Sequence, residues 1–108
     1  MRWQVSITVA AEQDLQNIKE YIAAESGEER IAIEIMAKFY AKLRGLSRMP
    51  YSRRLYPDDG LESRGVRYIV LGSYVALFSI NPDSNTVLVH RIVHHHQNAK
   101  TLDINSEG

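Results

Sequence analysis

The amino-acid sequence predicts an α+β domain in which a helical hairpin packs on one face of a mainly antiparallel four-stranded sheet. Three observations predict this fold: an alternating N-terminal run, two stretches with helical spacing joined by a few residues, and three strand-like runs in the second half of the chain. The predicted element order is β-α-α-β-β-β. The length of 108 residues suffices for one hydrophobic core and not for two. We expect a single domain over residues 1–100, followed by a mobile tail over residues 101–108.

The first strand leads directly into the first helix. Residues 3–9 alternate apolar and polar side chains with a period of two, which predicts a half-buried strand. Apolar side chains then recur at helical spacing, at Ala11, Leu15, Ile18 and Ile22. Thr8 is the expected N-cap of this helix, because its hydroxyl can accept a hydrogen bond from a backbone N–H of the first turn.

The second helix is predicted to follow after a short turn. Gly27 is suited to end the first helix, and Ser26 with Glu29 fits a capping box that would begin the second. One stripe of this second helix is apolar, and it comprises Ala32, Ile35, Met36, Phe39, Leu43 and Leu46. Two helices joined by so few residues pack antiparallel, which gives a helical hairpin.

The second half of the chain is predicted to be a loop followed by three strands. Residues 49–65 are rich in proline, glycine and aspartate, which predicts a loop. Residues 66–71 and 74–80 are strand-like, and Gly72-Ser73 between them is typical of a two-residue hairpin turn. Residues 81–85 form the next turn, and residues 86–93 form the last strand.

Composition and charge narrow the possible classes of protein. The sequence has no run of about 18 apolar residues and no cysteine, so we expect a cytoplasmic protein without a membrane span or disulfides. The net charge is zero, which is not typical of a general nucleic-acid binder. The charge is unevenly distributed, however, because residues 36–57 carry no acid and six bases, Lys38, Lys42, Arg44, Arg48, Arg53 and Arg54. This stretch is either a surface that binds phosphate or an acidic partner, or a solvated face.

Histidines gather at the end of the last predicted strand. His90, His94 and His96 share strand parity, so their side chains are expected to point the same way. They could form an acid–base pair that cleaves RNA, a zinc site, or simply a polar strand end. No Asp, Glu or Cys lies close by in the sequence to complete a metal site, and we expect neither a metal nor a cofactor.

Two arginines and two tyrosines lie in the predicted strands. Arg91 is flanked by apolar residues, so it needs a carboxylate or phosphate partner, such as Asp83 or an acid from the helices. Arg67 opens the second strand. Tyr68 and Tyr74 either stack on nucleic-acid bases or pack within the sheet.

Several motifs, in this order, resemble the ParE/RelE superfamily of toxins from type II toxin–antitoxin systems. The resemblance covers about residues 3–98 and depends on the runs at 10–18, 21–23, 50–57, 65–67, 74–78 and 87–94. It implies the β-α-α-β-β-β layout and a cognate antitoxin whose C-terminal segment wraps around the toxin. The basic residues Lys38, Lys42, Arg44, Arg53 and Arg54 are then expected to meet that acidic partner.

The two branches of this superfamily differ in activity. RelE-like toxins cleave ribosome-bound mRNA, but here Val75 occupies the place of one of their arginines, and no tyrosine follows Tyr74. ParE-like toxins poison DNA gyrase, and this sequence resembles them at Arg67 and His94, although His95, His96 and Gln97 replace the rest of their last motif. The ParE-like branch is favoured.

The alternatives are a ribosome-dependent endoribonuclease and a non-toxic protein that binds an antitoxin. The residues expected to contact the target are Arg67, Tyr74, Arg91, His94 and His96. If the protein is a nuclease, the catalytic set would be Arg67, Arg91, His94 and His96.

Overall fold

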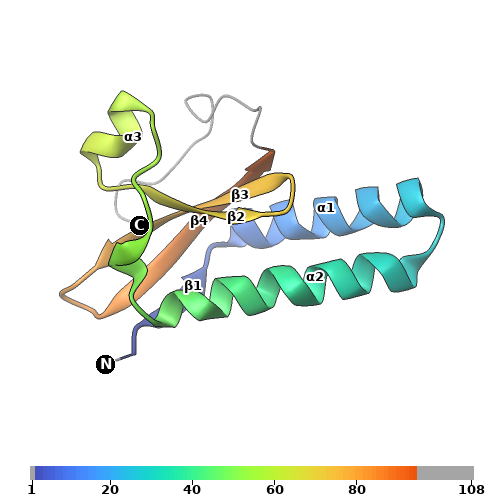
Figure 1. Cartoon of the computed structure of the whole chain (residues 1–108), viewed down its shortest axis with the longest axis horizontal. Coiled ribbons are helices and arrows are strands. Elements are labelled where there is room, and N and C mark those ends of the chain that lie inside the picture. The colour runs from blue at the N-terminus through green and yellow to red at the C-terminus, as the bar shows by residue number, and fades with distance from the viewer. Residues whose placement is uncertain (1, 95–108) are drawn as a thin grey trace.

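The computed structural model describes residues 2–94 (Figure 1). The long elements are β1 (Gln4–Ile7), α1 (Val9–Ser26), α2 (Glu29–Arg44), β2 (Arg67–Leu71), β3 (Tyr74–Asn81) and β4 (Thr86–His94). Two 3₁₀ turns (Gly45–Ser47 and Pro50–Ser52) and the short helix α3 (Asp59–Ser63) lie between α2 and β2. The predicted mobile tail and His96 lie outside the described residues. Within residues 2–94, no helix combines the length and apolar composition needed to cross a membrane.

The four strands form one mixed sheet in the order β1-β4-β3-β2. β1 runs parallel to β4, with Gln4 opposite Thr86, whereas β3 runs antiparallel to both of its neighbours, β4 and β2. The α1–α2 hairpin covers one face, and its far end projects beyond the strands (Figure 1). The predicted α+β fold, with a helical hairpin on a mainly antiparallel sheet, is confirmed.

The ends of the two long helices follow from local sequence signals. The hydroxyl of Thr8 accepts a hydrogen bond from Ala11 N, as an N-cap does. Gly27 ends α1 in the left-handed conformation, with φ of 74°. The predicted capping box at Ser26 is wrong, because α1 continues through Ser26 and extended Glu28 becomes the N-cap of α2. The Ser26 hydroxyl instead accepts a hydrogen bond from Glu28 N within the turn.

The sheet is covered on both faces, which the sequence did not predict. The main core lies between the sheet and the helical hairpin, and it includes Leu15, Phe39, Leu43 and Phe78. On the opposite face, a second buried cluster comprises Leu61, Val66, Val75, Leu77 and Val93. Residues 49–65 are therefore not only loop.

Helix α3 supplies Leu61 to the second cluster. The Asp58 side chain caps this helix by accepting a hydrogen bond from Leu61 N. Val66 N donates to Leu61 O, which fixes the return of the chain toward β2. The short helix thus exists because it is capped at its start and buries one large apolar side chain.

Candidate binding site

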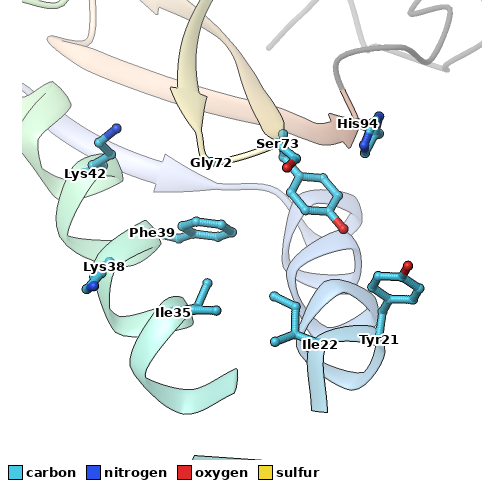
Figure 2. Close-up of a pocket in the computed structure, with 10 residues that line it drawn as sticks. Tyr21, Ile22, Ile35, Lys38, Phe39, Lys42, Gly72, Ser73 and His94 are labelled. Atoms are coloured by element: carbon cyan, nitrogen blue, oxygen red, sulfur yellow. The ribbon is translucent and has the colours of Figure 1, made fainter. Parts of the chain in front are cut away.

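An open groove lies between the helical hairpin and the β2–β3 turn (Figure 2). We call it the hairpin groove, and its volume is about 760 Å³. Its lining comes from α1, α2, the β2–β3 turn, the start of β3 and the end of β4, and comprises Tyr21, Ile22, Ile35, Lys38, Phe39, Lys42, Gly72, Ser73, Tyr74 and His94. The groove forms where the helical hairpin extends beyond the strands that the structure describes (Figure 1).

Aromatic contacts hold the groove lining in place. The ring of Tyr74 packs edge-to-face against Phe39 and His94, with centroid distances of 6.4 and 5.5 Å. Burial raises the pKa of the Tyr74 phenol, and the nearby Tyr21 raises it further. The phenol therefore stays neutral at physiological pH and can donate a hydrogen bond.

A glycine allows the β2–β3 turn to lie close to helix α2. Gly72 has a φ of +59°, and a Cβ added there would lie 3.5 Å from Phe39 Cζ. A side chain at this position would be in ordinary contact with the ring, but its backbone would be strained. The turn thus forms a fixed wall of the groove.

Two lysines of helix α2 give the groove a basic edge. Lys38 and Lys42 are four residues apart, so both lie on the same side of the helix. Lys42 Nζ also donates a hydrogen bond to Val70 O, at 3.0 Å, on the outer edge of β2. An apolar floor with a cationic edge suits a polypeptide segment that carries apolar and acidic side chains.

A second hollow, the basic cleft, follows the outer edge of β2 and has a volume of about 430 Å³. Its lining is Lys42, Gly45, Ser52, Arg53, Arg54, Tyr68, Ile69 and Val70. Lys42 therefore belongs to both hollows. The basic residues predicted to meet an acidic partner are split by the fold, with Lys38 in the groove and Arg53 and Arg54 in the cleft. Arg44 is exposed and lines neither.

Arg67 lies beneath the turn formed by residues 49–54. Its Nη1 donates to Arg53 O at 2.6 Å and to Tyr51 O at 3.4 Å. Its guanidinium also lies 5.3 Å from the centre of the Tyr51 ring, a cation–π contact. Arg67 thus supports the turn that presents Arg53, and a contact between Arg67 and a target stays a prediction.

Arg91 is joined to helix α1. Its Nε and Nη2 donate to the two carboxylate oxygens of Asp14, at 2.7 and 2.9 Å. Ile92 N donates to the same carboxylate at 2.9 Å. The predicted pairing of Arg91 with an acid is confirmed, and the partner comes from the helices and not from Asp83. The sequence held no signal for Asp14 itself, which lies 77 positions away.

His90 and His94 lie on opposite faces of the sheet, so the predicted common orientation is wrong. A β-bulge causes this difference, because Phe78 pairs with Val89 while Leu77 pairs with Arg91, which leaves His90 as the extra residue. His94 packs on Tyr74 in the groove.

His90 is 4% exposed, and its Nε2 lies 2.7 Å from Ser79 Oγ. Burial lowers the pKa of His90, and the positive charge of Arg64 lowers it further. His90 is therefore neutral and enclosed. Across residues 2–94, no group of three acidic, histidine or cysteine side chains is placed to hold a metal ion.

The fold and these hollows define a class of small α+β proteins with an open, partly apolar groove that has a basic edge. Comparison with known families is more specific. Residues 5–99 match the model of the ParE toxin of type II toxin–antitoxin systems, parDE. The chain therefore belongs to the ParE toxin family, as the sequence motifs predicted.

Solved structures of toxin–antitoxin systems share the fold. A structure of the chromosomal ParDE system from P. aeruginosa is similar with a TM-score of 0.71 at 18% identity, over 86% of this chain and 96% of that one. The RelBE2 toxin–antitoxin complex from Mycobacterium tuberculosis is similar with a TM-score of 0.58 at 21% identity, over 87% and 99% of the two chains. A comparison with curated proteins found no significant match.

Proposed function

We propose that this ParE-family toxin inhibits DNA gyrase and is neutralised by a cognate antitoxin that binds the hairpin groove. The observation that carries the proposal is the family match over residues 5–99. Gyrase is the target expected of the ParE-like branch that the sequence resembles.

The hairpin groove supports binding of an antitoxin segment. Its floor presents Ile35 and Phe39, and its edge presents Lys38 and Lys42. The basic cleft continues the cationic surface from Lys42 to Arg53 and Arg54. An amphipathic acidic segment that follows both hollows would bury apolar surface in the first and neutralise charge in the second.

The placement of the predicted catalytic residues supports a binding protein over a nuclease. His94 packs on Tyr74, Arg91 is engaged with Asp14, and Arg67 supports a turn. A nuclease needs its acid, base and phosphate-binding groups around one reacting position. In the described part of the chain, these three side chains are held by three different partners and not around one position.

Tyr74 and His94 are the predicted target residues that line the groove. An antitoxin segment in the groove would cover both side chains. Neutralisation then follows directly, because the target and the antitoxin compete for the same surface. Arg67, Arg91 and His96 stay proposed target contacts.

The test combines two assays on the purified protein. Inhibition of gyrase supercoiling, with accumulation of cleaved DNA and no cutting of ribosome-bound mRNA, is the expected result. Cut mRNA with normal supercoiling would replace the proposal by the ribonuclease, and no effect in either assay would leave an antitoxin-binding protein without toxicity. The same two readouts, plasmid topology and mRNA integrity, apply after induction in a bacterial host.

Variants of the groove lining make the test specific. His94→Ala and Tyr74→Phe are expected to weaken gyrase inhibition by about 10-fold or more, which corresponds to roughly 1.4 kcal/mol of lost interaction. Arg30→Ala is the matched control, because Arg30 is an exposed residue in an ion pair with Glu34 near the tip of the hairpin. If Arg30→Ala lowers inhibition as much as His94→Ala, the groove is not the target surface.

A further inference from the structure

We infer that the hairpin groove also binds a second copy of this chain, so that two helical hairpins pack face to face and antiparallel around a two-fold axis. In this dimer the tip of each hairpin lies beside the lysine edge of its partner's groove. The apolar linings of the two grooves are buried between the copies. The inference goes beyond the proposed function, because it requires neither antitoxin nor gyrase.

The hairpin has an apolar face that the strands of the described chain leave open (Figure 1). Ile22 of α1 and Ile35 of α2 are only partly buried there, and Tyr21 is 59% exposed. The side chains of Ile22 and Ile35 extend toward each other between the two helices (Figure 2). An open apolar surface with charged residues at its edge is typical of a protein–protein interface.

The charges on this face are separated along the length of the hairpin. Glu28 lies at the tip, whereas Lys38 and Lys42 lie in the groove lining nearer to the sheet. Glu25 lies on the groove side of α1, because it follows Tyr21 by four residues. Within residues 2–94, neither lysine is paired with a carboxylate. The tip is therefore acidic, and the end near the sheet is basic.

This separation of charge favours a second copy as the occupant of the groove. A two-fold axis makes every contact occur twice, and an antiparallel arrangement places the acidic tip of one hairpin opposite the basic end of the other. Glu28 and Lys38 are ten positions apart, which corresponds to about 15 Å along a helix. An axis halfway between them therefore forms two Glu28–Lys38 contacts at once. A parallel arrangement would instead oppose like charges.

Glu28 can exchange its present contact for a lysine of a second copy. Its carboxylate lies 3.2 Å from Arg30, but both side chains are more than half exposed, so solvent screens this pair. Glu28 precedes α2 without a side-chain capping bond, so a new partner does not uncap the helix. Any other ligand of the groove must then displace the second copy, which lowers the apparent affinity of that ligand as the protein concentration rises.

Charge reversal on the whole chain tests the inference. Sedimentation equilibrium over about 1–500 µM should show a monomer–dimer equilibrium with a Kd on the order of 10 µM. Lys38→Glu and Glu28→Lys each replace two attractive contacts by two repulsive ones, so each variant alone should dimerise about 10-fold more weakly. An equimolar mixture of these two variants restores opposite charges in both contacts. The mixture should therefore dimerise about as tightly as the parent protein.

Lys19→Glu and Glu20→Lys are the matched controls, because they reverse the same charges outside the groove lining and should dimerise as the parent does. Far-UV circular dichroism checks that every variant is folded. A parent protein that stays monomeric, or that forms larger assemblies, would overturn the inference. Equal weakening by the control variants, or a mixture no tighter than either variant alone, would also overturn it. These measurements use neither antitoxin nor gyrase, so their failure leaves the test of the proposed function intact.

Discussion

The ion pair between Asp14 and Arg91 should make a large contribution to the stability of the fold. Asp14→Ala removes a carboxylate that accepts from Arg91 Nε, Arg91 Nη2 and Ile92 N. Removing one partner of a fully buried pair costs about 3–5 kcal/mol. The Arg91 and Asp14 side chains are 23% and 13% exposed, so solvent screening reduces our expectation to about 2–3 kcal/mol.

Thermal unfolding measures this loss. The entropy of unfolding is about 2.1 cal/mol/K per residue, or roughly 0.2 kcal/mol/K for a chain of this length, so the expected fall in Tm is about 9–13 °C. Arg30→Ala serves as the control, because its ion pairs are exposed and should contribute less than about 1 kcal/mol. A double-mutant cycle of Asp14→Ala with Arg91→Met should give a coupling energy of about 1–3 kcal/mol.

Two results would refute this reasoning. A fall in Tm for Asp14→Ala no larger than for Arg30→Ala would show that the pair adds no special stability. A coupling energy of zero would assign the whole loss to the Ile92 N–H. The gyrase assay on Arg91→Met then addresses function, because a stable variant that no longer inhibits gyrase would identify Arg91 as a target contact.

Three further predictions concern a buried histidine, a turn and the edge of the groove. The pKa of His90 in the folded protein lies below its ordinary value, so below about pH 6.5 the unfolded chain binds more protons than the folded one. The free energy of unfolding should therefore be highest above that pH and should decrease below it, by up to about 1.4 kcal/mol per pH unit. Urea midpoints between pH 7.5 and 5 should show this loss, and a slope unchanged in His90→Gln would contradict it. Gly72→Ala should lower the free energy of unfolding by about 1 kcal/mol, because the φ of Gly72 is +59°. Gly45→Ala should not lower Tm, because Gly45 has a right-handed helical backbone and a Cβ there would meet open space. Lys38→Glu should weaken binding of the cognate antitoxin about 10-fold, as measured by titration calorimetry. Lys19 lies outside the groove lining, so Lys19→Glu should bind the antitoxin as tightly as the parent protein does. Equal losses of affinity in the two variants would argue against the groove as the antitoxin site.

Features with local signals were predictable from the sequence. The Thr8 cap, the left-handed Gly27 and the Gly72-Ser73 turn each depend on the conformational preferences of a few adjacent residues. The apolar stripe of α2 was equally clear, since helical spacing alone identifies it. These signals fixed the order of elements and hence the fold class.

Features that depend on distant contacts were not predictable. Strand parity placed His90 with His94, but the bulge depends on the register between β3 and β4. The choice of Asp14 as partner of Arg91 depends on how α1 crosses the end of β4. Helical spacing predicts Ile35 and Phe39 as core residues. That they also line an open groove depends on how far the hairpin extends beyond the sheet, which the spacing does not indicate.

The position of β4 within the sheet has a consequence for synthesis of the protein. This strand lies between β1 and β3, although its residues 86–94 are translated after those of the other three strands. Gln4 therefore has no strand partner until Thr86 has been made. Pairing across 82 positions also requires a large loop to close, which slows folding. A nascent chain on the ribosome therefore lacks both a complete sheet and the His94 wall of the groove. Sheet and groove become available together, only after residue 94 has been translated.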